Sequence, residues 1–463
     1  MVRLEYLAFE HNNAAAELVR QAYDTPPLAF VHSYGCQQNV NDGERIKGVL
    51  VDIGYGLCDK PEDADLILFN TCAVREHAEQ RVFGNLGALT HTKKQNPEQI
   101  ICLCGCMAQE AHVAQKVKES YRHVDLVFGP QLLWQFPHLL LDRLTSGKRV
   151  FATEDVPGAV AEGIPVVRQN RQKAWVSIMY GCNNFCTYCI VPYVRGRERS
   201  RRPEDILAEV RELAQAGYQD ITLLGQNVNS YGKDLGLGVD FAWLLEQVNA
   251  IPGEFLIRFM TSHPKDAGAR LFDTMAACEK VAPVLHLPFQ SGSSRVLQAM
   301  HRGYTREHYL SLVDELRARI PEIVLTSDVI VGFPGETQEE FEQTMSLIET
   351  VRYDALFTFL FSPRRGTPAE RMPDPMPKEQ KSANFQRLLQ RQNEISWEKH
   401  QRYVGGVYRC LVDGQGTDGR LTARTDGGRL VHLAGDPGCI GTWQNARITE
   451  ASTWALFGDV VEG

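Results

Sequence analysis

Hydrophobic and polar positions follow a repeated strand-then-helix pattern in the first third of the chain. Three short apolar runs have the length of buried strands: Leu28–Ser33, Asp65–Asn70 and Gln99–Leu103. Each run leads into a segment with helical spacing, and these segments begin near Asp42, Val74 and Gln109. Because strands that alternate with helices form parallel sheets covered on both faces, we predict an open α/β domain over residues 28–147.

Two stretches lack this pattern. Residues 1–27 show little apolar periodicity and end in Pro26 and Pro27, so we expect an N-terminal extension of unknown use, with ordered structure starting at Leu28. A stretch rich in Pro, Gly and acidic residues, from Thr153 to Gln169, predicts a connection between domains.

A longer alternation of the same kind fills the centre of the chain. The candidate strands are Ala174–Met179, Asp220–Leu224, Phe255–Met260, Val284–Pro288, Ile323–Val331 and Ala355–Phe361. One helix between them begins at Pro203 and stops at Gly217, and another begins with Thr337 and Glu340 in a capping box. Six such units predict a partial (β/α)6 barrel of the TIM type over residues 168–398, with its working edge at the strand C-termini.

The pattern of hydrophobic and polar positions changes again near the C-terminus. A helix-like bridge from Pro377 to about Tyr403 leads into short strands that are separated by Gly and Asp turns. Residues 401–463 therefore predict a small all-β, OB-like barrel, and the whole chain is an α/β protein with this barrel at its end.

Composition narrows the class of protein. The 463 residues allow about three domains, and 43% hydrophobic and 23% charged content is ordinary for a globular enzyme. No apolar run is long enough to cross a membrane and no secretory signal is visible, so we expect a cytoplasmic protein without a membrane partner. The net charge of −8 argues against a basic coat for nucleic acid. Twelve cysteines in a reducing compartment indicate metal binding or catalysis more than disulfides.

Cys182, Cys186 and Cys189, here called the core trio, have the spacing C-x3-C-x2-C directly after the first strand of the central domain. Three thiolates this close can bind three irons of a 4Fe-4S cluster and leave the fourth iron open to another ligand. The alternative is a zinc loop, but zinc sites usually pair two C-x2-C knuckles, and no second knuckle or suitably spaced His follows.

The segment around the core trio resembles the signature of the radical S-adenosylmethionine (SAM) superfamily. The resemblance implies that SAM binds the open iron and is cleaved to a 5′-deoxyadenosyl radical. It also implies that Tyr188 stacks near the SAM adenine, although plain packing is the alternative for this ring.

Cys36, Cys72 and Cys106, here called the N-terminal trio, each lie just past the C-terminal end of a predicted strand. Ligand sites in open parallel sheets lie at that edge, so the three thiols could meet and hold a second cluster. The alternative is that they are buried apolar residues. The other six cysteines, which we expect to be dispensable, are Cys58, Cys102, Cys104, Cys278, Cys410 and Cys439.

The sequence around the N-terminal trio is informative as well. The blocks Gly35-Cys-Gln-Gln-Asn, Asn70-Thr-Cys-Ala-Val-Arg-Glu and Gly105-Cys-Met-Ala-Gln resemble those of the methylthiotransferases, a radical SAM family with a C-terminal TRAM domain. Four further segments resemble the branch that modifies tRNA: Arg75-Glu76, Leu224-Gly-Gln-Asn-Val-Asn, Thr261-Ser-His-Pro and Val331-Gly-Phe-Pro-Gly-Glu-Thr.

The family resemblance implies an activity, cofactors and partners. The activity is methylthiolation at carbon 2 of N6-dimethylallyladenosine at tRNA position 37, with two SAM molecules and two 4Fe-4S clusters. The partners are the tRNA anticodon stem-loop and an external electron donor of the flavodoxin or ferredoxin type, and we expect a monomer. The alternatives are a sister enzyme acting on threonylcarbamoyladenosine or on a ribosomal protein, an iron–sulfur RNA-binding or electron-transfer protein without SAM chemistry, and a zinc-stabilised RNA-binding protein.

Two further sets of side chains are candidates for ligand contacts. The segment from Arg168 to Arg202 contains eight Lys or Arg and one acidic residue. This balance predicts a phosphate-binding patch beside the core trio, with a solvated loop as the alternative. Its candidate RNA contacts are Arg195, Arg197, Arg199, Arg201 and Arg202. Polar residues at the barrel strand ends are expected to contact SAM together with Tyr188: Gln226, Asn227, Gln290, Ser291 and Asp328.

Overall fold

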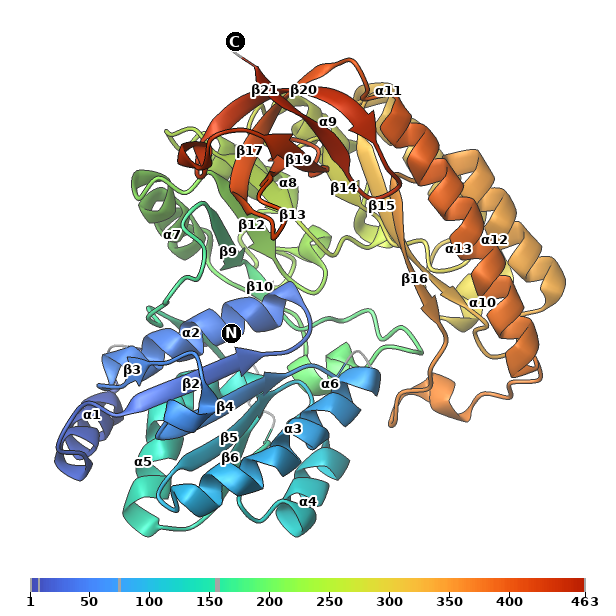
Figure 1. Ribbon diagram of the computed structural model, residues 1–463. Helices are drawn as coiled ribbons and strands as arrows, with labels where there is room; N and C mark the ends of the chain where they lie inside the picture. Colours follow the sequence, from blue (N-terminus) through green and yellow to red (C-terminus); the bar gives the residue numbers. More distant parts are fainter. Residues whose placement is uncertain (1, 7–8, 74–75, 155–158, 462–463) are drawn as a thin grey trace.

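Six parallel strands form the sheet of the N-terminal domain in the computed structural model, which describes residues 2–6, 9–73, 76–154 and 159–461 (Figure 1). Their order is β3-β2-β4-β5-β6-β7. The bounds are β2 Leu28–Ser33, β3 Gly56–Leu57, β4 Leu66–Thr71, β5 Ile100–Gly105, β6 Leu126–Phe128 and β7 Val150–Ala152. The central strands β4 and β5 are buried along their whole length, as expected for parallel strands with both faces covered.

Helices cover both faces of this sheet, which confirms the open α/β prediction. The helices are α2 Gln37–Asp52, α3 Glu76–Gln95, α4 Ala111–Ser120 and α5 Phe136–Ser146. Apolar residues of α2 and α5 belong to one core, whereas those of α3 and α4 belong to the core on the opposite face. The helix expected to begin near Val74 starts at Glu76 in the structure, and Val74 and Arg75 lie outside the described residues.

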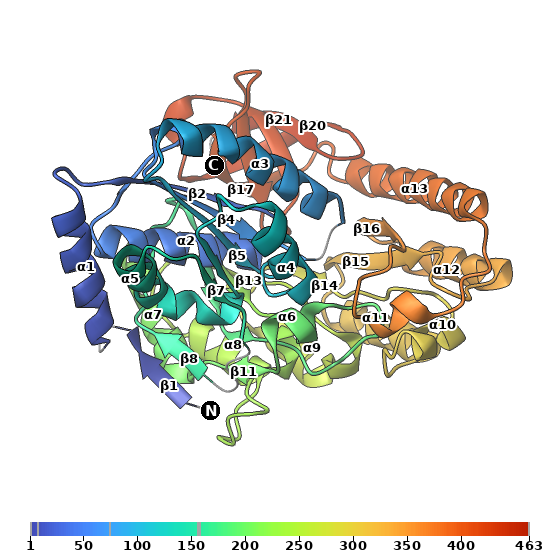
Figure 2. The same cartoon turned by 90° about the horizontal axis from the view of Figure 1, so that it is seen from below.

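The first 27 residues contain regular structure, which corrects the prediction that order begins at Leu28. Strand β1, Val2–Glu5, pairs in parallel with β8, Ala159–Glu162, inside the segment expected to be only a connection. Helix α1, Glu10–Ala22, packs against α5 at one end of the molecule (Figure 2). The apolar face of α1 is short and rich in alanine, and the partner of β1 is distant in the chain, so neither element has a strong local signal.

Two three-stranded parallel sheets form the central domain, in the orders β13-β12-β9 and β14-β15-β16. The strands are β9 Lys173–Ser177, β12 Asp220–Leu224, β13 Leu256–Phe259, β14 Val284–His286, β15 Val324–Val331 and β16 Ala355–Leu360. Among the described residues β9 and β16 do not pair with each other, so the barrel is open, as predicted.

The helices of the central domain alternate with its strands. They are α6 Val191–Arg195, α7 Pro203–Gln215, α8 Phe241–Asn249, α9 Ala269–Ala277, α10 Ser294–Ala299, α11 Arg306–Arg319 and α12 Gln338–Val351. The predicted capping box of Thr337 and Glu340 is present at the start of α12. A short antiparallel pair, β10 Met179–Tyr180 with β11 Arg199–Ser200, brackets the loop that carries the core trio.

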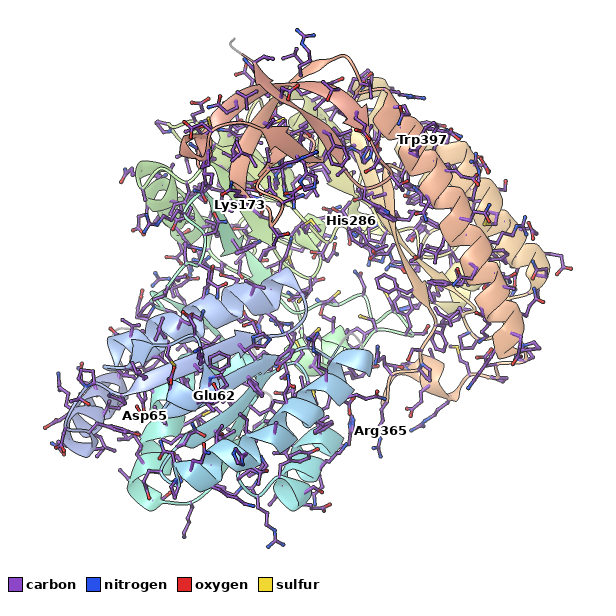
Figure 3. All side chains as sticks on the ribbon, in the orientation of Figure 1. Glu62, Asp65, Lys173, His286, Arg365 and Trp397 are labelled. Atoms are coloured by element: carbon purple, nitrogen blue, oxygen red, sulfur yellow. The ribbon has the colours of Figure 1, made fainter. Side chains whose placement is uncertain are left out.

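The C-terminal strands close into a five-stranded barrel in the order β17-β18-β19-β21-β20, after the long helix α13, Lys378–Gln401. Their bounds are β17 Val407–Gln415, β18 Leu421–Thr425, β19 Leu430–Ala434, β20 Trp443–Ala451 and β21 Leu456–Val461. Lys173 on β9, which Figure 3 labels, forms an ion pair with Asp413 of the barrel, and Arg429 of the barrel pairs with buried Asp354. The barrel and the N-terminal domain lie on opposite sides of the central domain (Figure 1). None of the helices in the described ranges has the length and apolarity needed to span a bilayer.

Candidate functional site

The N-terminal trio lies at one edge of the N-terminal sheet. Cys72 and Cys106 come directly after the neighbouring strands β4 and β5, and Cys36 follows β2, the next strand in the sheet. The Cys36 and Cys106 sulfurs lie 3.8 and 3.9 Å from Asn39 Oδ1, and the Cys36 thiol also shares a hydrogen bond with Cys72. The structure therefore brings together the three thiols that the strand ends predicted.

Two glycines allow the strand ends to approach this closely. Gly35 has a φ of +103°, and a Cβ on it would lie 2.3 Å from the Cys72 Cβ. Gly105 has a φ of +93°, and its Cβ would lie 2.4 Å from the Thr71 carbonyl oxygen. Each glycine directly precedes a cysteine of the N-terminal trio, so the Gly-Cys pairs in the sequence reflect a backbone path that only glycine follows without strain.

The thiols of the N-terminal trio differ in acidity. The hydrogen bond with Cys72, assisted by the positive charge of Arg195, lowers the pKa of Cys36 to about 6. Burial raises the pKa of Cys106 to about 11, and Arg195 opposes this rise. Since metals bind thiolates, the cation beside Cys36 and Cys106 favours the protonation state that a cluster requires.

The core trio lies in the loop between β10 and α6. The Cys189 N–H donates to the Cys186 carbonyl (2.9 Å) and the Cys182 N–H to the Gly196 carbonyl (3.1 Å), so the loop is folded back on itself. Burial, followed by smaller effects that include the neighbouring thiols, raises the pKa of Cys182 to about 11 and of Cys189 to about 12. Arg302 Nη1 lies 3.4 Å from the Cys186 sulfur and places a buried cation beside this trio also.

Both trios have the donor chemistry of an iron–sulfur cluster site. Each provides three thiols and one adjacent buried arginine, Arg195 or Arg302. In the part of the chain that the structure describes, no three His, Cys, Asp or Glu side chains surround a single metal-ion position. A 4Fe-4S cluster is held by thiolates on different irons, so its ligands need not converge on one point.

The other six cysteines have ordinary surroundings. Cys102 and Cys104 are buried within β5, and burial raises the pKa of both well above the usual value. Cys278 and Cys410 are buried in other cores, and Cys58 and Cys439 are partly exposed. That all six are dispensable stays a prediction.

Four of the five polar residues expected to contact SAM follow the ends of β12 and β14, whereas Asp328 lies within β15; several of them are already engaged in hydrogen bonds. Gln226 Oε1 accepts from the Gly181 N–H (2.5 Å), Asn227 Nδ2 donates to Asp266, and Ser291 Oγ accepts from the Ser293 N–H. Asp328 Oδ2 lies 3.5 Å from His286 Nε2. The Tyr188 hydroxyl accepts from Arg302, so this ring is tied to the cation beside the core trio.

Buried polar atoms without partners mark where the barrel offers free hydrogen-bonding capacity. Among the described residues these include Gln290 Oε1, Asn227 Oδ1, both amide atoms of Asn229, Ser262 Oγ and His263 Nε2. Thr261 and Gln290 also have positive φ angles, +67° and +64°, which are unusual for residues other than glycine. No role was predicted for Asn229, Ser262 or His263, although they lie in the Leu224–Asn229 and Thr261–Pro264 segments that resemble the tRNA-modifying branch.

The structure corrects the prediction that all five arginines of the basic segment contact RNA. Arg195, Arg199 and Arg201 are only 5%, 8% and 4% exposed, so they are not available to a phosphate backbone. Arg201 is held by Glu162 and Glu209, and Arg199 by Gln131 and the Arg195 carbonyl. A count of charges within the basic segment does not reveal these partners, because Glu162, Glu209 and Gln131 lie outside it.

Two of the five arginines remain exposed. Arg197 lies 4.2 Å from the ring centre of Phe185, which contacts the half-exposed Tyr193 edge to face. Arg202 is exposed and pairs only at the surface with Glu204. Exposed Arg197, half-exposed Tyr193 and partly exposed Phe185 therefore form a basic and aromatic group beside the core trio.

Comparisons with known proteins agree with the domain order seen in the structure. Family models match at residues 29–129 (Uncharacterized protein family UPF0004), 176–348 (Radical SAM superfamily) and 401–461 (TRAM domain). A tRNA-2-methylthio-N(6)-dimethylallyladenosine synthase from Acetivibrio thermocellus is 50% identical over 94% of this chain and 91% of its own length. The protein of the same name from Alkaliphilus oremlandii is 50% identical over 94% and 92%.

Solved structures show the fold at lower similarity. The radical S-adenosylmethionine methyltransferase TsrM from Kitasatospora setae, solved with cobalamin and a 4Fe-4S cluster, superposes with a TM-score of 0.54 at 16% identity. The alignment covers 75% of this chain and 77% of that one. The match to the Radical SAM superfamily over the central domain implies a 4Fe-4S cluster and SAM there.

Proposed function

The chain belongs to the family of the tRNA-2-methylthio-N(6)-dimethylallyladenosine synthases, and on this premise we propose that it adds a methylthio group to carbon 2 of N6-dimethylallyladenosine at tRNA position 37. The observation that carries the proposal is the presence of two separate cysteine trios at the edges of adjacent domains, each with its own buried arginine. A carrier of electrons needs no open iron, whereas a reaction that joins sulfur to an unactivated carbon needs a radical source and a sulfur source.

The two trios have different tasks in this proposal. The core trio holds the SAM-binding cluster, and the N-terminal trio holds a second cluster; when bound, these groups supply the radical that removes the C–H hydrogen and the sulfur that replaces it. The residues of the chain hold and orient both groups. Arg302 and Arg195 place positive charge beside the thiolates, and burial of four of the six cysteines keeps bulk water away from them.

SAM would bind at the strand C-termini of the barrel, beside the core trio. The unpartnered atoms of Asn229, Ser262, His263 and Gln290 supply donors and acceptors for its polar groups. Burial, together with the nearby cations Arg302 and Lys265, lowers the pKa of His263 to about 2, so this ring is neutral and offers one donor and one acceptor. Tyr188 presents an aromatic ring beside Cys189.

The RNA would approach through the exposed groups beside the core trio. Arg197 and Arg202 offer guanidinium forks to phosphates, and Phe185 and Tyr193 offer rings on which unpaired bases can stack. The target adenine must leave its stack to reach the space between the trios, as in other enzymes that modify bases. An external electron donor of the flavodoxin or ferredoxin type and a monomeric state complete the proposal.

The decisive experiment combines one enzymatic assay with one genetic assay. Anaerobically reconstituted protein should contain roughly eight irons per chain, four for each cluster. With a reductant, SAM and a stem-loop carrying dimethylallyladenosine, it should release 5′-deoxyadenosine and form the methylthiolated base. Cys106→Ala and Cys182→Ala should each abolish the methylthiolated product, whereas Cys104→Ala serves as the matched control.

The outcomes separate the alternatives. Persistence of the methylthio mark on dimethylallyladenosine in tRNA from a deletion strain contradicts the proposal. Methylthiolation of threonylcarbamoyladenosine or of a ribosomal protein instead identifies a sister enzyme. Absence of 5′-deoxyadenosine with iron bound indicates an iron–sulfur protein without SAM chemistry, and a colourless preparation that contains zinc indicates a zinc-stabilised RNA-binding protein.

A further inference from the structure

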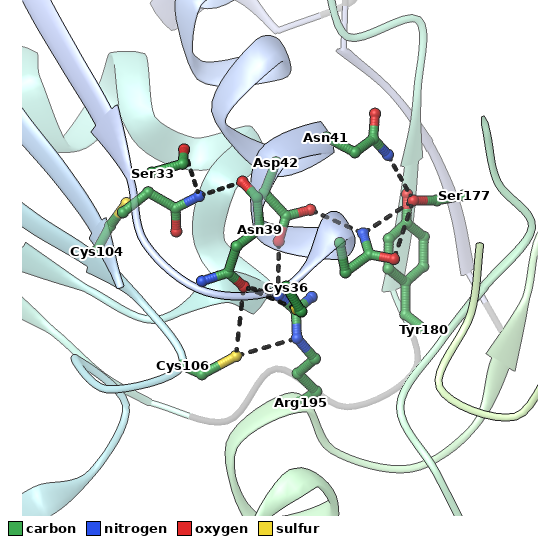
Figure 4. A network of polar contacts seen from close by, with 12 residues as sticks. Ser33, Cys36, Asn39, Asn41, Asp42, Cys104, Cys106, Ser177, Tyr180 and Arg195 are labelled. Atoms are coloured by element: carbon green, nitrogen blue, oxygen red, sulfur yellow. Dashed lines mark hydrogen bonds and ion pairs between the residues drawn. The ribbon is translucent and has the colours of Figure 1, made fainter. Parts of the chain in front are cut away.

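Arg195 connects the loop of the core trio to the N-terminal trio. It is the last residue of α6, which begins two residues after Cys189. Its Nε donates to the Cys106 sulfur (3.1 Å), and its Nη2 donates to Asn39 Oδ1 (2.8 Å) and Asp42 Oδ2 (2.7 Å), as Figure 4 shows. A single side chain thus contacts one cysteine of the N-terminal trio and two residues of α2, while its backbone continues from the core trio.

The first turns of α2 carry the buried polar side chains that this contact requires. Gln38, Asn39, Asn41 and Asp42 are all buried, although polar residues at buried helix positions are costly unless they have partners. Their partners lie largely outside the helix: Gln38 and Asn41 bond the Ser177 hydroxyl at the end of β9, and Asp42 bonds Arg195. The start of α2, directly after Cys36, is therefore joined to the central domain by a polar interface (Figure 4).

Arg195 suits this position because of its shape. A guanidinium is planar and presents several donors in fixed directions, so it can hold a sulfur and two oxygens at once. A lysine amine would keep the charge opposite Asp42 but could not reproduce the three directions. Asn39 Oδ1 accepts from Arg195 and also lies within hydrogen-bond distance of the Cys36 and Cys106 sulfurs, so the contact extends to two of the three thiols.

We propose that Arg195 is a positioning residue that holds the N-terminal trio at a fixed place relative to the core trio. This inference rests on the proposed function, in which the sulfur site and the radical site must serve the same adenine carbon. A lysine in place of Arg195 keeps the positive charge beside the thiolates but not the three donor directions, so both cluster sites persist while their separation is no longer held. SAM cleavage then continues while transfer of sulfur to the RNA becomes inefficient. A misplacement of about 1 Å can cost a reaction about a hundredfold in rate.

The test compares Arg195→Gln with Arg143→Gln in the reconstituted full-length protein. Arg143 is the matched control, because it is a mostly buried arginine of the N-terminal domain whose guanidinium pairs with buried Asp125 rather than with a cysteine. Three quantities are measured: iron per chain, hydrogen exchange of residues 37–52, and methylthiolated base formed per 5′-deoxyadenosine released. For Arg195→Gln we expect faster exchange at the start of α2 and, in protein that retains iron, a ratio of products that falls about tenfold or more.

The possible results decide between the proposal and its rivals. A ratio of products equal to that of the wild type overturns the proposal, and so does an equal fall in Arg143→Gln, which would indicate general destabilisation. If Arg195→Gln does not retain iron, the comparison is made with Arg195→Lys. A lowered ratio of products in Arg195→Lys supports positioning by the planar guanidinium, and an unchanged ratio overturns the proposal. If the wild type releases 5′-deoxyadenosine but forms no methylthiolated base, the proposed function fails, whereas faster exchange of α2 in Arg195→Gln alone still supports the positioning role.

Discussion

Replacing Gly35 by alanine should damage the N-terminal trio out of proportion to the size of the change. The backbone at Gly35 has a φ of +103°, and the added Cβ would lie 2.3 Å from the Cys72 Cβ and 2.7 Å from its sulfur. Carbon atoms in good contact lie about 3.5–4.0 Å apart, so Cys72 or the Gly35 backbone must move by roughly 1 Å. A left-handed conformation costs about 1–2 kcal/mol for a residue with a Cβ, and overpacking a buried site costs about 1–3 kcal/mol. The expected loss of folding free energy is therefore about 2–5 kcal/mol.

Iron content is the sharper measure of this change, because the displaced atom is the Cys72 sulfur itself. In a background in which the core trio is replaced by alanines, Gly35→Ala should lower iron per chain and the midpoint of urea unfolding. Gly84→Ala on α3 is the matched control: no atom lies within 4 Å of its added Cβ, so it should keep iron and stabilise the chain by about 0.5–1 kcal/mol. Wild-type iron and stability in Gly35→Ala would refute the steric argument.

Other consequences of the structure can be measured separately. Cys104→Ala should cost about 1 kcal/mol in urea unfolding and leave iron unchanged, whereas Cys106→Ala should remove the iron of the N-terminal trio; the reverse result would show that the wrong cysteine was assigned. Burial raises the pKa of Glu336 from 4.5 to about 7, so between these values the carboxyl stays protonated in the folded chain and ionises in the unfolded chain. The contribution of Glu336 to the free energy of unfolding should be full below pH 4.5 and be lost as the pH rises to 7. Urea titrations of Glu336→Gln should lack that loss of stability. Arg197→Ala should reduce the slope of log affinity against log salt for a single-stranded RNA loop by about 0.7, and an unchanged slope would exclude a phosphate contact. Arg201→Ala should instead destabilise the fold by about 3–5 kcal/mol in urea unfolding, because it leaves Glu162 buried without its partner; a smaller loss would mean that water reaches that carboxylate.

Much of the fold was predictable because its elements have strong local signals. The runs that became β2 and β12 were predicted with the bounds that the structure shows, since each is a short run rich in apolar residues between turns. The N-terminal trio was also predictable as a group, because the ends of adjacent parallel strands lie at the same edge. The elements β1 and α1 were missed because they are stabilised by β8 and α5, which lie far away in the sequence.

The sequence by itself determined the strands of the central domain, the three longest strands of the N-terminal sheet, the C-terminal barrel, the two cysteine trios and the presence of a strongly basic segment. Only the tertiary structure decided what each arginine of that segment does. Arg195 and Asn39 are 156 residues apart in the sequence, yet they are hydrogen-bonded in the structure. Arg195, which was predicted to contact RNA, is therefore a buried residue that connects the two cysteine sites. The physical reason is that the charge of an arginine is a local property of the chain, whereas its burial and its partners depend on which distant segment packs against it.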